Sequence, residues 1–403
     1  MILRHFIFFI LLVVLPDFYI DYRFLRQRQD MPAWKRLLWW TPCFLMAAFT
    51  CFMAAQDDFI PRNYLLLEIY IGLLGVLVIP KLLFSICSLV GLLFKKCRCR
   101  LQRSSQEKRF EVTTFHLSER VGVVVASMGL LAFVYGFTLG FNQVEVEHKD
   151  LYFTDLPQTF DGYRIVQVSD LHAGTYNGWR RAVLHDLADS IQNQHPDLIC
   201  FTGDLQNIRP DEVLEVKQEL SQWGDVVSVM GNHDYGEYIG GDEKDRQAVE
   251  HRMKEVQRRH LDWVLLDNSN VSISDSTGSS RIYIAGTGND GKAPFPNKAD
   301  YKKALQGIPQ GAFVIMLQHD PSAWKRNILP QTKTQLTLSG HTHGGQFSLF
   351  GWRPTQLVHG EDYGYYEQDG QSLVVSGGVG GVVPFRLGIP GSITVITLHR
   401  KTP

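Results

Sequence analysis

The stretch Tyr163-Arg164-Ile165-Val166-Gln167-Val168-Ser169-Asp170-Leu171-His172 decides the fold. Its apolar part predicts a buried strand, and its end carries Asp170 and His172 to the point where the chain leaves the sheet. Ligands of open α/β sheets bind at that end of the strands. Asp-x-His is weak evidence by itself, so its meaning depends on the polar residues later in the chain.

Four further polar blocks lie beyond it, each at the end of another predicted strand. They are Gly203-Asp204, Gly231-Asn232-His233-Asp234, Gln318-His319 and Gly340-His341-Thr342-His343. Together with Asp170 and His172 they supply enough carboxylate, amide and imidazole groups to hold two metal ions. A lone Asp or His at a strand end is usually a cap or a surface group, whereas five such blocks in one chain indicate a shared site.

The order of the predicted strands and helices gives the fold class. Strands are predicted at 144–147, 163–169, 198–202, 226–230, 281–285, 312–317, 335–339, 372–376 and 392–398. Helices are predicted near 180–194 and 211–222 and at 242–259. Strand and helix alternate early and strands dominate later, which indicates an α/β fold, a layered sandwich of mixed sheets.

The first 142 of the 403 residues contain most of the long apolar runs, and the net charge of -1 gives no indication of a nucleic-acid partner. About 20 apolar residues cross a bilayer as a helix. The segments that meet this criterion are 5–20, 37–55, 64–94 and 121–142. We therefore predict a transmembrane region of about four helices at 1–142 and a folded domain at 143–403. The first segment lacks a small-x-small cleavage site, so we expect it to be retained as an anchor.

Lys and Arg in the loops predict the orientation in the membrane. The loops at 21–36 and 95–120 are rich in both, whereas the loop at 56–63 has Asp57 and Asp58 against one Arg. Basic loops stay in the cytoplasm. Four spans then place the folded domain on the non-cytoplasmic side of the cell (inner) membrane.

The segment 64–94 leaves an alternative open, because Pro80-Lys81 interrupts its apolar run. We expect one helix, since either half alone is too short to cross a bilayer. Two passes would instead place the folded domain in the cytoplasm. Glu68 and Lys81 are expected near the helix ends or facing other helices. The scarcity of charged or paired polar residues within the spans argues against a transporter or channel.

The polar blocks suit the hydrolysis of phosphate esters. Two metal ions about 3.5–4 Å apart lower the pKa of a bound water and neutralise charge on the transferred group. Asp170 and His172 can turn toward one ion, and Asp204 is the natural bridge between two. The predicted metal ligands are Asp170, His172, Asp204, Asn232, His319, His341 and His343. Imidazole and carboxylate ligands suit manganese, iron or zinc, in a divalent or trivalent state.

His233 is the remaining histidine of the blocks. It lies beside Asn232, and we predict that it acts as the general acid for the leaving group. Asp234 is predicted to orient His233 through its other ring nitrogen, as carboxylates do for many histidines near metals. The catalytic residues predicted from the sequence are therefore His233 and Asp234.

The five blocks resemble the pattern of the calcineurin-like metallophosphoesterase superfamily, D-x-H, G-D, G-N-H-[DE], H and G-H-x-H. Here they read SDLH, TGD, GNHD, QHD and SGHTH, within about residues 145–403. The extended form GHTHGGQ, with SGGVGGVVPFRLG near the end of the sequence, is similar to the membrane-associated bacterial branch of YkuE- and YaeI-like proteins. The resemblance implies a four-layer α/β/β/α sandwich of mixed sheets after the transmembrane region.

The resemblance also implies how the ligands are shared. One metal would take Asp170, His172, Asp204 and His343, and the other would take Asp204, Asn232, His319 and His341. A metal-bridging hydroxide would attack phosphorus, and His233 would assist the departing oxygen. Gln206-Asn207 replaces the acidic residue that often comes after G-D in that branch, and Pro390-Gly391 replaces its frequent Pro-Glu. Neither departure touches a ligand, but both bear on the choice of substrate.

These patterns favour a membrane-anchored phosphoesterase with two metals that hydrolyses phosphodiesters. Lipid-linked or envelope phosphates are the favoured substrates, because the domain is tethered to the bilayer. The alternatives are a phosphomonoesterase, a nucleotide pyrophosphatase, or a non-catalytic membrane sensor, and the complete ligand set argues against the sensor. The Gly-rich stretch 379–387 is expected to be a buried turn rather than a loop that enters lipid.

Overall fold

The computed structural model describes residues 5–28, 31–101 and 107–401, and for 98–101 and 107–116 it describes the backbone alone. The chain forms two compact units, Met1–Phe137 and Thr138–Pro403. Compact units need not coincide with functional domains, so the limits at 1–142 and 143–403 stay a prediction.

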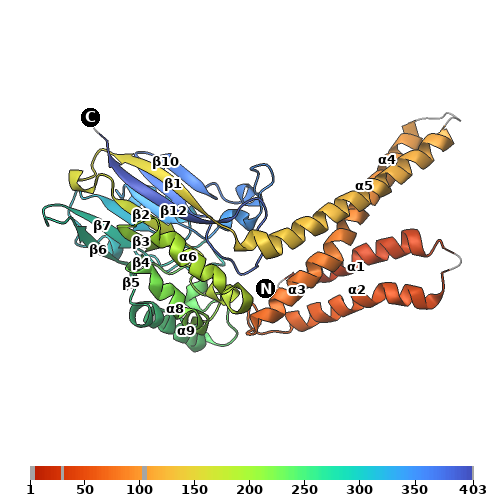
Figure 1. The fold of residues 1–403 in the computed structure, drawn as a ribbon, viewed down its shortest axis with the longest axis horizontal. Helices are drawn as coiled ribbons and strands as arrows, with labels where there is room; N and C mark the ends of the chain where they lie inside the picture. The colour runs from red at the N-terminus through yellow and green to blue at the C-terminus, as the bar shows by residue number, and fades with distance from the viewer. Residues whose placement is uncertain (1–4, 29–30, 102–106, 402–403) are drawn as a thin grey trace. The chain divides into compact units, whose positions relative to one another are not determined.

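The first unit is helical (Figure 1). Its helices are α1 (Phe6–Ile20), α2 (Ala33–Ala54), α3 (Tyr64–Leu73), α4 (Ile79–Leu101) and α5 (Glu107–Tyr135). Within the described residues, three stretches are long and apolar enough to cross a membrane, namely Ala33–Ala54, Tyr64–Cys97 and Leu117–Gly140. With 15 residues, α1 is shorter than those, so the fourth predicted span stays a prediction.

The segment with Pro80-Lys81 is a continuous helix. Helical turns over Leu74–Val78 join α3 directly to α4, and Pro80 lies in the first turn of α4, where proline is tolerated. A continuous helix cannot reverse direction, which favours one pass over two. The predicted loop at 95–120 agrees with the candidate spans, which end at Cys97 and begin again at Leu117, but parts of it are helical because α4 runs to Leu101 and α5 begins at Glu107. The rest of that loop, 102–106, lies outside the described residues.

Two buried carboxylates of the first unit lie beside cations. The Lys81 ammonium of α4 lies 2.8 Å from the buried Asp17 carboxylate of α1. The buried Asp21 lies 2.9 Å from the guanidinium of Arg36 on α2. Asp17 and Lys81 lie within predicted spans, whereas Asp21 and Arg36 lie in the predicted loop 21–36, so ion pairs inside the spans are few among the described residues. The expectation that Lys81 faces another helix is confirmed.

The second unit contains two six-stranded sheets (Figure 1). The strands of the first, in spatial order, are β1 (Val144–Phe153), β12 (Gly391–Arg400), β2 (Arg164–Val168), β3 (Leu198–Phe201), β4 (Val226–Ser228) and β5 (Val264–Leu265). Those of the second are β10 (Gly364–Gln368), β11 (Gln371–Val375), β9 (Leu336–Ser339), β8 (Val314–Leu317), β7 (Arg281–Gly286) and β6 (Ser269–Ser274). Both sheets mix parallel and antiparallel pairs, as predicted.

Helices cover the outer faces of the two sheets. They are α6 (Ala182–Gln192), α7 (Pro210–Glu215), α8 (Lys217–Leu220), α9 (Glu243–Glu255), α10 (Tyr301–Ala304) and α11 (Leu329–Gln331). The apolar face of α6, including Leu187, packs with Val166 of β2, while Ile165 belongs to the core between the sheets. On the far side, Trp324 packs with Met316 of β8. The four-layer α/β/β/α sandwich is therefore confirmed.

The strand register brings the polar blocks to one edge. The parallel pairs β2–β3–β4 and β7–β8–β9 end there together. β12 runs antiparallel to β2, with Thr394 opposite Gln167, and β1 begins beside the start of β12, with Val144 opposite Gly391. The first strand thus enters the sandwich at the same edge that carries the blocks.

Candidate metal centre

Each predicted ligand lies just beyond the carboxyl end of a strand. Asp170 and His172 come after β2, Asp204 after β3 and Asn232 after β4, whereas His319 comes after β8 and His341 and His343 after β9. The first sheet therefore supplies three oxygen ligands and one imidazole, and the second supplies three imidazoles. Strand ends that share one edge can bring residues 173 positions apart in the sequence into one cluster (170 to 343).

Five of these residues have left-handed backbone. Their φ angles are 53° for Asp170, 50° for His172, 59° for Asp204, 75° for His341 and 53° for His343. Such angles are uncommon for residues other than glycine and cost of order 1–3 kcal/mol each. Each strand therefore turns sharply just after it ends, which directs the polar side chain back over the sheet edge.

Asp170 is enclosed so closely that one neighbour must be glycine. A Cβ at Gly340 would lie 2.3 Å from an oxygen of the Asp170 carboxylate. The backbone N–H of His341 donates to that carboxylate at 3.0 Å. The glycine before His341 therefore allows the loop after β9 to close over the end of β2.

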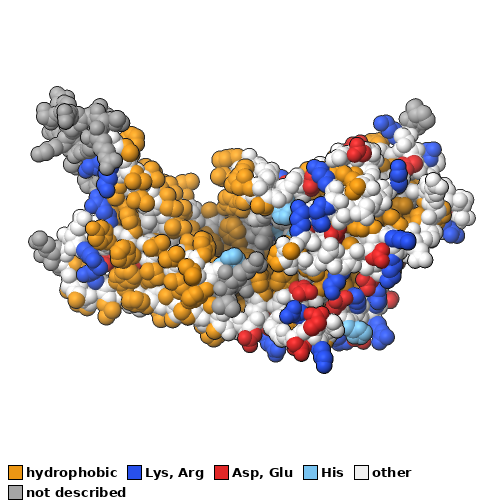
Figure 2. Space-filling model, turned by 180° about the vertical axis from the view of Figure 1, so that it is seen from behind, with side chains coloured by type: hydrophobic (Ala, Val, Ile, Leu, Met, Phe, Trp, Pro, Cys, Tyr) orange, Lys and Arg blue, Asp and Glu red, His pale blue; other side chains and the backbone are white. Residues whose placement is uncertain are grey.

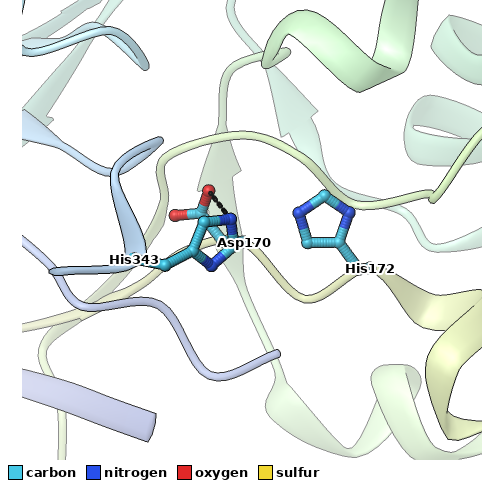
Figure 3. A group of neighbouring side chains, drawn as sticks. All are labelled: Asp170, His172 and His343. Atoms are coloured by element: carbon cyan, nitrogen blue, oxygen red, sulfur yellow. Dashed lines mark ion pairs between the residues drawn. The ribbon is translucent and has the colours of Figure 1, made fainter. Parts of the chain in front are cut away.

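The ligand atoms form overlapping groups. Asp170, His172 and His343 offer atoms within 4.8 Å of one another, and so do Asp204, His319 and His341. A third such group, His172, Asp204 and His233, shares one residue with each of the other two. Figure 3 shows the Asp170 carboxylate beside the His343 ring, 3.5 Å from Nε2, with the His172 ring next to both.

The two groups meet at Asp204. One of its oxygens lies 3.2 Å from His319 Nε2 and 3.7 Å from His172 Nε2. Asn232 joins the second group, since its amide oxygen lies 3.2 Å from His319 Nε2. All seven predicted ligands therefore lie in one connected cluster, in which Asp204 joins the two groups.

Electrostatics at the centre favour a cation. Burial raises the pKa of Asp204, but His319 and the neighbouring histidines outweigh it and hold that pKa well below its ordinary value. Burial lowers the pKa of His319, but the Asp204 carboxylate outweighs it and raises that pKa to about 10. A positive charge, whether a proton or a metal ion, is thus stabilised beside Asp204.

The buried histidines also fit a metal ligand's requirements. Burial and the nearby His233 hold the pKa of His172 well below its ordinary value, so its ring is neutral. Both of its ring nitrogens are buried without a hydrogen-bond partner among the described residues, and so is Nδ1 of His343. Buried polar atoms are nearly always hydrogen-bonded, so such nitrogens fit donors to a metal.

Comparison with known proteins identifies the family. The family model for "Calcineurin-like phosphoesterase" matches residues 163–345, and that for "Probable Calcineurin-like phosphoesterase, transmembrane domain" matches residues 3–141. The uncharacterized metallophosphoesterase YkuE of Bacillus subtilis is 30% identical over 60% of this chain and 81% of its own length. This chain belongs to the calcineurin-like metallophosphoesterase family. It has a transmembrane region before its metallophosphoesterase domain, and it is a membrane protein.

Two further relatives are named as metallophosphoesterases or as having a metallophosphoesterase domain. An uncharacterized metallophosphoesterase of Aquifex aeolicus is 28% identical over 59% of this chain and 85% of its own length. A "transmembrane protein with metallophosphoesterase domain" of Danio rerio is 26% identical over 53% of this chain and 47% of its own length. Members of the family depend on metal and act as hydrolases, which agrees with the Asp and His groups gathered at the strand ends.

In this metallophosphoesterase, His233 is oriented differently from the prediction. Its Nδ1 lies 2.6 Å from the backbone oxygen of Asn207, so a carbonyl and not Asp234 faces that nitrogen. Because a carbonyl can only accept, Nδ1 carries the proton. The His233 ring lies 4.8 Å from the His172 ring, which places it at the cluster, and it stacks on Tyr238 at 4.1 Å.

Asp234 has a structural position instead of the predicted one. Its buried carboxylate accepts backbone N–H groups of Gly231, Asp204, Leu205 and Gln206. Four donors aimed at one side chain fix the turn after β3 against the turn after β4. Asp234 therefore holds the loop that carries Asp204.

Three residues at the centre were not singled out from the sequence. Tyr238 accepts a hydrogen bond from the Asn232 amide nitrogen at 2.7 Å, which turns the amide oxygen toward His319. The buried Arg386 donates to the backbone oxygens of Gly377, Gly378 and Gly380 and so holds the Gly-rich loop against Asp170. Asn207 was quoted only as a departure from the family pattern, and the signal for its role was its place after Asp204.

Proposed function

We propose that this protein hydrolyses phosphodiesters at a centre of two metal ions. The observation that carries the proposal is the pair of ligand groups that meet at Asp204. One ion would be held by Asp170, His172, Asp204 and His343, and the other by Asp204, Asn232, His319 and His341. When bound, two such ions supply an activated water and neutralise the charge of the phosphate. The assignment of these residues as ligands is part of the proposal.

The chain's own residues supply the remaining steps. His233 keeps a proton on Nδ1 through the Asn207 carbonyl, and its Nε2 delivers a proton to the departing oxygen. Asp234 keeps the Asp204 turn in place, and Tyr238 keeps the amide oxygen of Asn232 directed at the centre. His341 and His343 are partly exposed, whereas His172 and His319 are buried, so substrate approaches from the side of the former pair.

The favoured substrates are lipid-linked or envelope phosphodiesters, because the domain comes directly after a membrane span. The topology adds support, since β1 enters the sandwich at the edge that carries the ligands. We also propose that the domain lies on the non-cytoplasmic side, because the continuous helix from α3 to α4 favours one pass. Protease added to right-side-out membrane vesicles should remove the domain, and in inverted vesicles the domain should be protected.

The activity is tested with the full-length protein in detergent. Metal is stripped by a chelator, and manganese, zinc or iron is added back before hydrolysis of bis(p-nitrophenyl) phosphate and of p-nitrophenyl phosphate is followed. We expect metal-dependent turnover with the diester preferred. A preference for the monoester would indicate a phosphomonoesterase. The absence of turnover by folded, metal-loaded protein would indicate a binding protein.

A further inference from the structure

The second unit has an apolar surface that its fold does not explain. Ten large apolar side chains of this unit are exposed among the described residues, and five of them fall within ten positions: Leu349, Phe350, Trp352, Leu357 and Val358. The other five are scattered along the unit's sequence at Leu139, Tyr152, Trp179, Val264 and Tyr365. We call residues 349–358 the apolar loop. Figure 2 shows hydrophobic side chains gathered on this unit near histidine side chains.

The tip of the apolar loop presents its most exposed side chain, Phe350, on an unfavourable backbone conformation. Leu349 and Trp352 exchange backbone hydrogen bonds at 2.9 and 3.0 Å, so Phe350-Gly351 is a two-residue turn. Both turn residues have positive φ, 51° and 85°, a pattern that favours Asn, Asp or Gly at the first position. Phe350 occupies that position with its side chain fully exposed, and a polar residue would suit the turn better.

The apolar loop carries little charge. Arg353 is the one ionisable residue between Phe347 and Val358. Its guanidinium is neutralised by the Asp362 carboxylate at 2.7 Å. An exposed apolar surface of this kind, without free charge and with Trp and Phe at its tip, suits the interface of a lipid bilayer.

Within the second unit, the apolar loop is linked both to the metal centre and to the start of the first strand. It begins six residues after His343, and the His341 and His359 rings at its two ends lie 6.2 Å apart. Ser348 pairs with Leu387, and four residues later Gly391 donates to the backbone oxygen of Gln143. Gln143 lies three residues beyond the apolar helix Leu117–Gly140, a stretch that spans about 10 Å at most.

We propose that the apolar loop inserts into the surface of the bilayer that anchors the chain and so opens the metal centre toward lipid phosphates. Continuity along the chain selects the bilayer as the occupant, since the apolar helix ends three residues before Gln143, which accepts a hydrogen bond from Gly391 at the start of β12. The inference about substrate access rests on the proposed function, whereas insertion of the loop does not. A second protein or a second copy of this chain on the loop would be a different outcome.

Insertion is measured on the full-length protein in phosphatidylcholine–phosphatidylglycerol vesicles. Cys51, Cys87, Cys97 and Cys99 are replaced by serine, and an NBD fluorophore is placed at Phe350→Cys or at the control Val264→Cys, an exposed apolar position on β5. Nitroxide-labelled lipid should quench about half or more of the emission at 350 and little at 264. Equal quenching at both positions, or none at 350, would overturn the proposal.

Access to lipid is measured with Phe350→Asp combined with Leu357→Asp. Hydrolysis of a dioleoyl phosphatidyl p-nitrophenyl diester in vesicles should fall about tenfold, since two apolar anchors are lost. Hydrolysis of soluble bis(p-nitrophenyl) phosphate should change less than about twofold, because no ligand is altered. Equal losses on both substrates, or no loss on the lipid, would contradict the proposal. If the unaltered protein does not hydrolyse the soluble diester, the proposed function fails while the quenching result still decides insertion.

Discussion

The two units treat buried charge in opposite ways. In the helical unit, two buried carboxylates have a cation beside them, Lys81 for Asp17 and Arg36 for Asp21. In the sandwich, Asp204 is surrounded by histidines, and the nitrogens of His172 have no hydrogen-bond partner among the described residues. A structural interior pairs its charges, whereas a site leaves donor atoms for a ligand.

The backbone shows the same contrast. Among the described residues of the helical unit, no residue other than glycine has positive φ, because most of these residues adopt the ordinary right-handed helical conformation. In the sandwich, five of the seven proposed ligands have a positive φ angle. Local strain concentrated in the residues of one cluster is typical of a functional site, and the rest of the fold must offset its free-energy cost.

The largest expected effect comes from Asp204→Asn. Asp204 is the carboxylate at which the two ligand groups meet, so its loss should lower diester hydrolysis about 1,000-fold. Groups that only orient metal ligands typically account for about 10–100-fold. The amide can still accept the His233 backbone N–H, which keeps the turn folded. Metal content per chain should fall as well. Asp186→Asn, an exposed position, is the control, and unchanged activity in Asp204→Asn would refute a shared carboxylate.

The next effect concerns stability of the helical unit. Lys81→Met leaves the buried Asp17 without its cation, which should destabilise the unit by about 3 kcal/mol. Thermal unfolding in detergent measures the change. Adding Asp17→Leu removes the unpaired charge and should restore most of the stability. A double variant no more stable than the single one would show that the pair does not act as a unit.

His233→Ala should lower turnover about 100-fold while metal content stays constant. The loss should be larger for a diester with an alkyl leaving group than for p-nitrophenyl, because a poor leaving group needs the proton more. His251→Ala, an exposed position on α9, serves as the control. Equal losses for both leaving groups would mean that His233 does not protonate the departing oxygen.

The smallest effect is expected for Tyr238→Phe. Without the acceptor at 2.7 Å, the Asn232 amide loses its fixed orientation, which should lower metal affinity about tenfold and turnover about fivefold. The apparent affinity for manganese is the readout, from activity against metal concentration. Tyr365→Phe on the outer strand β10 is the matched control. The roughly fivefold loss of turnover is expected at limiting metal, and its recovery at saturating metal is the signature of a positioning role.

Local patterns predicted much of the second unit. The strands β2, β3, β4, β7, β8 and β9 lie within two residues of their predicted positions, because short apolar runs bounded by polar blocks have few other ways to be buried. β6 was missed, since its sequence SNVSIS is polar, and β10 was missed because GYYEQ lacks an apolar run. The helix predicted at 211–222 is divided into α7 and α8 at Val216.

Errors in the first unit have a different origin. The described residues of the predicted loop 95–120 are helical because Lys, Arg and Glu form good helix outside a bilayer. The helices α4 and α5 therefore extend beyond the apolar segments that hydropathy identifies. The pairing of Asp17 with Lys81 joins residues 64 positions apart. Patterns within a short window of sequence cannot predict a contact between residues so far apart.

The sequence by itself determined the family, the α/β class and the identity of the seven candidate ligands, because residue types and their spacing are local properties that five motif blocks record. Only the tertiary structure decided what each side chain faces. Asp234 was predicted to orient His233, but the carboxylate holds four backbone N–H groups and the Asn207 carbonyl faces the imidazole. The meeting of both ligand groups at Asp204 and the exposure of Phe350 also depend on strand register and loop closure. These arise from packing between residues far apart in the chain, which spacing along the sequence does not encode.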